Sequence, residues 1–536
     1  MATSATPVLQ NGPWGGSGGG TPVDLTLRRF DLAMSVRARW EDVFDDCISY
    51  TLPHADRMRS GTDGESKTTR IYDSTAVSAL SDFASRLQSY VCPIGAEWAS
   101  IKSGPAVPAD RRPDIDRELR RVQDTVFDII RNSNFDMQLS EALHHYGIGT
   151  ACLLVEPGTA TRPIEFTAIP LNELVLENSA FGSPTGIFRQ RRIRNRDLPF
   201  FFPNPTIPIQ GLGRINRDPD GQTTVIEACL RQPTRQEEVW DHQVIFLEDR
   251  AIIDRELYVG VGSCPYLPFH WSKAAGDTYG RGPVMNVIGA IRVLNTIVEM
   301  MLEHADVQIA GMWQADDDGV INPETIRFYG GAVVPRAPGS SGLEPLTPGG
   351  KIEWISLGVE QMRGEIKRAL FDEPLGNMQQ DARIQTAQEV VERVADLSRR
   401  VGSSFGRLQA EMVQPLIRRI LYILRRQGRI RMPTLSSRVV EVSMNSPIGR
   451  TQGTSEVVAI QRLNQVLAEM FGPGAANLII KKADVSEALA DRLGVPLTLI
   501  NSPSEVAAIE QQMQRQQMLL EMLKGAGVPE GQAGLL

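Results

Sequence analysis

Two arginine-rich stretches are the candidates in this sequence for binding a charged partner. Guanidinium groups make bidentate contacts with phosphates and carboxylates. The first stretch spans 14 residues without Asp or Glu, so it could contact DNA, or it could form ion pairs between subunits and complement the end of a helix. Its members are Arg418, Arg419, Arg425, Arg426, Arg429 and Arg431. The second stretch, on a predicted strand, favours a solvated face or a protein contact over DNA, and it comprises Arg189, Arg191, Arg192, Arg194 and Arg196.

Three consecutive carboxylates, Asp316, Asp317 and Asp318, precede a glycine. They lack the alternating ligands and the terminal Glu of a calcium-binding loop, so we expect a turn whose acidity could bind a basic partner surface. Adjacent His144 and His145 would project about 100° apart on a helix and cannot share a metal ion. The sequence has no phosphate-cradling loop that ends in Lys-Ser or Lys-Thr. We therefore predict no catalysis, no cofactor and no metal site.

Composition limits the classes of function. The chain has 536 residues, 42% of them hydrophobic and 22% charged, which is typical of a globular protein of several domains. The net charge of −8 argues against a protein that grips phosphates over its whole surface, but not against one along which DNA slides. The five widely spaced cysteines favour buried thiols, and the Gly-rich residues 1–23 favour a disordered arm.

The periodicity predicts an α+β protein that is mainly helical, with β-rich inserts. Helices are expected over 24–48 and 73–91, and a strand-rich region over 148–271. A long helix over 280–308 has a polar stripe, which argues against a membrane span. A β-rich insert follows, and then a shorter helix over 358–371. Two such helices can pair antiparallel into a stalk with the insert at its tip.

The longest predicted helix begins near Thr386 and carries an apolar stripe at steps of three and four residues. Pro415 removes a backbone donor and should kink or break this helix. The stripe resumes beyond the proline. Its members are Val390, Val394, Leu397, Val401, Phe405, Leu408, Met412, Leu416, Ile420 and Leu424.

The amino-acid sequence of this helix resembles that of the portal (head-to-tail connecting) proteins of short-tailed bacteriophages. The family pattern T-A-x-E-V-x-E-R, then a Gly, then R-L-x-x-E and P-L, is matched in register. The matching residues are Thr386, Ala387, Glu389, Val390, Glu392, Arg393, Gly402, Arg407, Leu408, Glu411, Pro415 and Leu416. Four further segments resemble the family, among them the Y-G-R-G motif: Arg39–Pro53, Asp73–Trp98, Tyr279–Asn295 and Gly494–Gln517. The resemblance covers about nine-tenths of the chain.

The resemblance implies a ring, typically a dodecamer, at one capsid vertex of the virion, assembled in the host cytoplasm. Double-stranded DNA is packaged and ejected through its channel. Terminase docks first, and tail or adaptor proteins dock afterwards. Major capsid and scaffolding proteins are further partners, and no membrane is involved. The implied divisions are a disordered arm (1–23), wing (24–278), stem helix (279–308), clip (309–355), second stem helix (356–373), tunnel loop (374–384), long kinked helix with a wing strand (385–447), helical crown (448–524) and loose tail (525–536).

The family places a tunnel loop where this chain carries Gln379, Gln380, Asp381 and Arg383. Uncharged amides, and one Arg beside an Asp, would let DNA pass while limiting slippage. Two other classes of function remain open. One is a nuclease component of the packaging machine, which would need metal-binding carboxylates. The other is a tail adaptor or scaffold that binds protein only.

Overall fold

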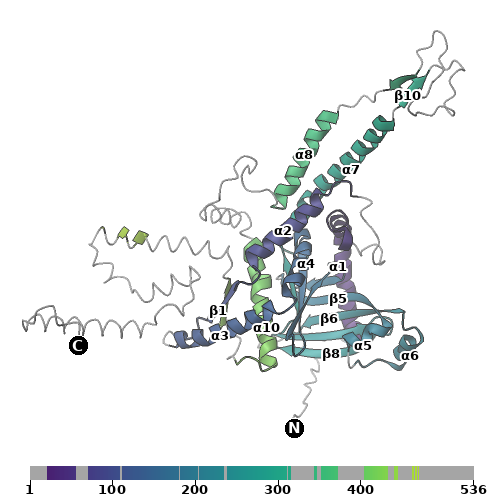
Figure 1. Cartoon of the computed structure of the whole chain (residues 1–536). Coiled ribbons are helices and arrows are strands. Elements are labelled where there is room, and N and C mark those ends of the chain that lie inside the picture. Colours follow the sequence, from purple (N-terminus) through teal and green to yellow (C-terminus); the bar gives the residue numbers. More distant parts are fainter. Residues whose placement is uncertain are drawn as a thin grey trace, which may run out of the picture. The chain divides into compact units, whose positions relative to one another are not determined.

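The computed structural model describes residues 21–55, 71–108, 111–179, 182–202, 205–233, 238–310, 312–315, 343–346, 352–371, 404–431, 440–444 and five positions between 462 and 469. The chain divides into two compact units. The first comprises residues 1–89, 101–380 and 403–443, and it holds nearly all of the described elements. The described residues mix helices with antiparallel sheets, so the predicted α+β class is confirmed (Figure 1). The predicted disordered arm lies outside the described residues apart from Thr21, Pro22 and Val23, which begin the first helix.

The largest sheet has five antiparallel strands in chain order: β4 (Leu174–Asn178), β5 (Pro184–Arg194), β6 (Gln222–Arg231), β7 (Val239–Phe246) and β8 (Ala251–Val259). The central strands β6 and β7 are buried along most of their length, whereas the edge strand β8 carries several exposed residues. The long helix α1 (Pro22–Thr51) covers one face, where Leu27 and Phe30 pack among the sheet's apolar side chains. The far end of the opposite face is covered by η3 (Asn195–Asp197), α5 (Leu198–Phe201) and α6 (Ile209–Arg217).

Helix α1 begins two residues before its predicted start at Asp24 and ends three residues beyond its predicted end at Ile48. Thr21 is the N-cap, with its hydroxyl accepting from the backbone N–H of Asp24 while the Asp24 carboxylate accepts from the Thr21 N–H. This capping box satisfies two backbone donors that a helix start leaves free. Further along, the Thr26 hydroxyl donates to Gln243 of β7, and Arg37 donates to the Leu174 carbonyl of β4. The helix therefore crosses the sheet from one side to the other.

A second, three-stranded sheet has the order β3-β2-β9 and is antiparallel throughout: β3 (Ile164–Ile169), β2 (Thr150–Pro157) and β9 (Tyr266–His270). Helices α3 (Arg112–Arg131) and α4 (Phe135–Ile148) precede it, and α4 leads into β2 through Gly149. The strand-rich region predicted after residue 148 is confirmed. The remaining short elements are η1 (Pro53–Ala55), α2 (Thr75–Val91), and the two-stranded sheet of β1 (Ala99–Ser103) and β12 (Val440–Met444).

The main chain packs unusually closely where α7 (Pro283–Ala310) leaves the three-stranded sheet. A Cβ at Gly280 would lie 2.4 Å from the Gly149 carbonyl oxygen, and a Cβ at Gly282 would lie 2.2 Å from the Gly147 carbonyl oxygen. The Gly282 N–H donates to the Ile148 carbonyl at 2.8 Å. Both glycines of the Y-G-R-G motif are thus required by backbone crowding, because only glycine allows two chains to approach this closely.

Helices α7 and α8 (Ile352–Ala369) pack against each other and run in opposite directions (Figure 1). Between them the chain forms the antiparallel pair β10 (Met312–Ala315) and β11 (Leu343–Leu346). This arrangement matches the stalk predicted from element order. The predicted start of α8 at Gly358 is wrong. The helix starts six residues earlier, at Ile352, and Gly358 lies inside it with open space around its Cα.

Residues 283–306 of α7 are long and apolar enough, by length and composition, to cross a membrane. The predicted polar stripe of this helix makes contacts within the protein. Arg292 pairs with Asp46 of α1, and buried Asn295 accepts hydrogen bonds from the backbone N–H groups of Tyr72 and Asp73. The stripe therefore joins α7 to two other parts of the chain.

The longest predicted helix is described from Ser404 onward, and its earlier part, 386–403, lies outside the described residues. Its apolar stripe is confirmed there, since Phe405, Leu408, Met412, Leu416, Ile420 and Leu424 are all buried. Pro415 does not break the helix. A π-helical turn (Gln409–Val413) comes directly before α10 (Gln414–Arg426), so the helix continues through an irregular turn where the proline removes a backbone donor.

Candidate functional site in the stalk and the arginine-rich helix

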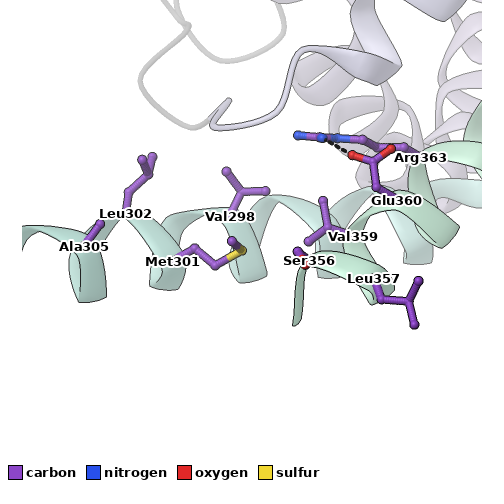
Figure 2. A pocket seen from close by; sticks show the side chains of 9 residues that line it. All are labelled: Val298, Met301, Leu302, Ala305, Ser356, Leu357, Val359, Glu360 and Arg363. Carbon is purple, nitrogen blue, oxygen red and sulfur yellow. Dashed lines mark hydrogen bonds and ion pairs between the residues drawn. The ribbon is translucent and has the colours of Figure 1, made fainter. Parts of the chain in front are cut away.

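An open apolar groove lies between the two stalk helices (Figure 2). Its volume is about 700 Å³. Four lining residues come from α7 and five from α8: Val298, Met301, Leu302, Ala305, Ser356, Leu357, Val359, Glu360 and Arg363. Leu302 and Leu357 are 52% and 57% exposed, although both are large aliphatic side chains. Exposed apolar surface of this kind marks a contact that another surface covers.

The base of this groove is held by charged and polar contacts. Arg363 of α8 donates from Nε and Nη2 to one oxygen of Asp73, at 2.9 and 2.7 Å, and its Nη1 contacts Glu360. Asp73 also accepts from the Thr75 N–H at 2.9 Å and so caps the start of α2. Burial alone would raise the pKa of Asp73, but the hydrogen bonds from Thr75 and Arg363 outweigh it and lower that pKa. Asp73 therefore stays ionised and ties α2 to α8.

The first arginine cluster divides into buried and exposed members. Arg419 is 1% exposed, and it donates to the carbonyls of Val155 and Ser263. Its guanidinium lies 5.3 and 5.4 Å from the ring centroids of Tyr258 and Tyr422. Burial lowers the pKa of Arg419. This residue fastens α10 to both sheets and is not available to an outside partner, which sets it apart from the other five arginines.

The remaining members of the cluster are nearer to solvent. Arg426 pairs with Glu256 of β8 at 2.7 Å, and Arg429 donates to the Ala160 carbonyl at 2.8 Å. Arg425 and Arg431 are exposed, and Arg418 is half-buried. The backbone of Arg418 lies against Gly262, where φ is +75° and a Cβ would meet the Arg418 carbonyl at 2.7 Å. Exposed guanidinium groups therefore gather at the C-terminal end of α10 and just beyond it.

The second arginine stretch is not one face, because alternate residues of β5 point to opposite sides. Arg189 pairs with Glu173 at 2.8 Å, and Arg191 pairs with the buried Glu227. The Tyr266 hydroxyl donates to the same Glu227 at 2.7 Å. Arg192 and Arg194 are exposed, and Arg196 pairs with Asp220. Two of the five arginines thus belong to the interior, which corrects the interpretation of the whole stretch as a solvated face.

Two groups of predicted site residues lie outside the described residues. They are the tunnel-loop residues Gln379, Gln380, Asp381 and Arg383, and the acidic residues Asp316, Asp317 and Asp318. Within the residues that the structure does describe, no group of three or more His, Cys, Asp or Glu side chains could hold a metal ion.

Sequence reasoning missed one polar pair in the interior. Glu411, in the π-helical turn, accepts from both the backbone N–H and the ring Nδ1 of His270, at 2.9 and 2.8 Å. Arg407 lies 3.4 Å from the other oxygen of the same carboxylate. The partners are 141 residues apart in sequence, so no local sequence pattern predicts that they pair. The irregular turn near Pro415 was the available signal, because π turns often place a side chain for a special contact.

The sequence also matches known proteins. A family model described as "Bacteriophage head to tail connecting protein" matches residues 24–500. The chain belongs to this family. Head-to-tail connecting proteins are structural components of the phage particle, and the chain is therefore a structural protein and not an enzyme.

Two curated relatives of this head-to-tail connecting protein are named portal proteins. That of Enterobacteria phage T3 is 23% identical over 494 residues, which cover 88% of this chain and 87% of the relative. That of Escherichia phage T7 is 21% identical over 495 residues, covering 89% of each. Solved structures with some similarity include the neck of an empty gene transfer agent particle (TM-score 0.38, 14% identity, 80% of this chain and 92% of that chain). Another is the neck of a native particle (TM-score 0.37, 13% identity, 77% and 90%).

Proposed function

We propose that this chain is a portal protein, the subunit of a ring at one capsid vertex through which double-stranded DNA is packaged and ejected. The observation that carries the proposal is the family match over residues 24–500, together with two portal relatives that align over nearly nine-tenths of the chain. The order of elements supports it, since a sheet-rich body leads into a two-helix stalk and back.

The open stalk groove supports assembly into a ring, which we take to be a dodecamer by resemblance to the family. Head-to-tail contacts between identical copies close into a ring when each copy presents two different, complementary surfaces. The groove offers one such surface, and the apolar side chains exposed on the outside of α7, such as Val293 and Met300, offer a second. A neighbouring stalk would remove both from water.

Electron microscopy of the purified full-length chain tests this function. We expect rings with an open central channel, and native mass spectrometry of the same sample gives the number of copies. Leu302→Gln should reduce the ring fraction, whereas Glu299→Gln, one turn away on the same helix, should not. A monomer that cleaves double-stranded DNA in a chelator-sensitive way would identify a nuclease component instead. A monomer that binds only tail proteins would identify an adaptor.

For the channel itself, we propose that Gln379, Gln380, Asp381 and Arg383 approach the DNA backbone. Amides provide hydrogen bonds without a net charge, and Arg383 is offset by Asp381, so phosphates are contacted without being held tightly. Deleting residues 379–383 should leave the rings intact but reduce the DNA retained in filled heads. Unchanged packaging and retention in the deletion variant would refute this role.

The exposed arginines at the end of α10 have two possible partners, which are DNA and an acidic surface of the neighbouring subunit. Arg425, Arg429 and Arg431 are all exposed. Replacing all three by Gln separates the two cases. Loss of DNA binding with a smaller salt dependence indicates phosphate contacts, because each lost contact reduces the release of counterions. Loss of ring assembly at unchanged DNA affinity indicates ion pairs between subunits.

We propose that the acidic residues Asp316, Asp317 and Asp318 form a docking surface of the clip for a basic partner. Terminase docks at this part of family members during packaging, and tail or adaptor proteins dock there afterwards. Major capsid and scaffolding proteins then hold the ring at the head–tail junction of the virion, after assembly in the host cytoplasm. Replacing the three aspartates by Asn should weaken terminase binding to purified rings, and unchanged binding would exclude this surface.

A further inference from the structure

The two edge strands of the five-stranded sheet differ in whether their outward-facing backbone groups have hydrogen-bond partners. At the β4 edge, side chains satisfy outward-facing backbone groups. The Leu176 N–H donates to the Tyr279 hydroxyl oxygen at 3.1 Å, and the Leu174 carbonyl accepts from Arg37. An edge closed in this way cannot pair with another strand.

The β8 edge is open over most of its length. The Gly260 N–H donates to the Glu238 carbonyl at 2.8 Å, and the ladder continues in register, with Tyr258 opposite Trp240. Since alternate residues of an antiparallel strand turn their backbone groups toward the partner, the residues between them face away from β7. These are Arg255, Leu257 and Val259. No described residue hydrogen-bonds to their outward backbone groups, whereas the Thr206 N–H covers the Ile253 carbonyl at 2.7 Å nearer the start of the strand.

The side chains along this open edge are apolar and exposed. Leu257 is 48% exposed and Val259 is 46% exposed, on the face of the sheet that α1 covers further along. Residues 255–259 contain no proline or lysine, which commonly protect an edge. The charge of Arg255 is directed across the sheet, where it pairs with the buried Asp241 of β7 at 2.7 Å. Unpaired backbone groups next to apolar side chains are what an added strand recognises.

The N-terminal residues of the chain start from the beginning of this edge. Arg250, in the turn between β7 and β8, pairs with Asp24 in the first turn of α1 at 3.2 Å. Because the Thr21 N–H donates to the same carboxylate, the described chain begins close to Arg250, the residue that precedes β8. A segment that runs back from that point along β8 toward Val259 is antiparallel to the strand, as every other pair in this sheet is.

The N-terminal sequence suits this path. The ten residues between Gln10 and Thr21 read NGPWGGSGGG, and a flexible Gly-rich chain of ten residues spans about 17 Å on average. The four residues from Ala251 to Arg255 span about 13 Å. A linker of this length therefore brings Val8–Gln10 level with residues 255–259, where an apolar side chain of the segment can cover Leu257 and Val259. Pro7 and Pro13 are tolerated, because an outermost strand needs N–H donors on one side only.

We propose that the segment around Val8–Gln10 adds a sixth, antiparallel strand to the β8 edge of the same copy. The added strand accepts and donates the hydrogen bonds that Arg255, Leu257 and Val259 offer. It also buries the two exposed aliphatic side chains.

Hydrogen exchange of the full-length chain and of a variant lacking residues 2–14 tests the added strand. Peptides covering 254–260 should exchange about tenfold faster or more in the deletion variant, because the outward N–H groups lose their acceptors. The Leu176 amide serves as an internal control and should not change. Equal exchange in the two proteins overturns the proposal.

Point variants separate strand addition from a general effect of the deletion. Val8→Pro with Leu9→Pro removes two N–H donors and should reproduce the faster exchange. Thr3→Pro with Ser4→Pro, outside the segment, should leave it unchanged. Failure of the first pair to speed exchange overturns the proposed segment. Protection that is present in assembled rings but absent in dissociated subunits overturns the assignment to the same copy.

Discussion

The two halves of α7 show opposite relations between apolar character and burial. In the first half, Val284, Ile291 and Leu294 are buried against the body. In the second half, the side chains of Met300 and Leu302 are exposed although they are equally apolar. The hydrophobic effect acts on both halves alike, so the difference lies in what is available to cover them. The first half contributes to folding of the subunit, and the second half is available to contribute to assembly.

The largest effect expected from this division concerns two glycines, one at the start of α7 and one inside it. Gly282→Ala should lower the free energy of unfolding by about 4 kcal/mol or more, because the new Cβ clashes with backbone that cannot move aside. Gly289→Ala should raise it by about 0.5–1 kcal/mol, since the position is open and alanine favours helix. Urea unfolding of both variants measures the contrast, and equal effects would contradict it.

A comparable contrast is expected within the first arginine cluster. Arg419→Ala leaves the carbonyls of Val155 and Ser263 without a donor and opens a cavity, so we expect a loss of about 3 kcal/mol in the free energy of unfolding. Arg425→Ala, on the exposed side of the same helix, should change it by less than about 0.5 kcal/mol. Denaturant midpoints at equal m-values provide the measurement. A large effect of Arg425→Ala on folding would break the distinction between interior and surface arginines.

The two leucines of α7 sharpen the comparison directly. Leu294 is 1% exposed, and Leu294→Ala should cost about 3 kcal/mol of folding free energy. Leu302→Ala should cost less than about 1 kcal/mol in the isolated subunit, because little surface is buried there. Among the variants that fold, ring formation measured by native mass spectrometry should be reduced more by Leu302→Ala than by Leu294→Ala. If Leu302→Ala leaves assembly intact, the groove is not the contact between subunits.

The smallest effect concerns the junction between the two halves, where Asp73 holds Arg363. The lowered pKa of this carboxyl means that its stabilising contribution is present above about pH 4, the usual pKa of Asp, and is lost as the pH falls through the folded-state value. Asp73→Asn should therefore lower the melting temperature at pH 7 by an amount that shrinks below pH 4. A difference that stays constant across this range would show that the charge of Asp73 is not what stabilises the junction.

Much of this fold follows from local pattern, and the exceptions have physical causes. The stripe through Met412 and the two-helix stalk follow from the spacing of apolar residues and the order of elements along the chain. The capping box at Thr21 does not, and it starts α1 two residues before the predicted helix. The separate fates of Arg419 and Arg425 were not, since which face of α10 meets the two sheets depends on the tertiary fold. The same limit applies to Asn295, which binds the backbone of residues that lie 222 and 223 positions away.

The candidate functional residues divide in the same way. The sequence shows that the arginines of the first cluster are close together, but not which of them are exposed. For the second stretch, the sequence does not show that Arg191 pairs with a buried carboxylate. That carboxylate, Glu227, lies on the neighbouring strand and is recognisable only once the register of β5 and β6 is known.

The crowded main chain around Gly149, Gly280 and Gly282 has a mechanical consequence. The stalk is joined to the three-stranded sheet by backbone against backbone, without a side chain between them that could act as a spacer or change rotamer. The direction in which α7 leaves the body is therefore set by tightly packed backbone around Gly149, Gly280 and Gly282. Forces applied along the stalk pass into β2 and β9 without first being absorbed by rearranging side chains, so the joint transmits load where a packed interface would yield.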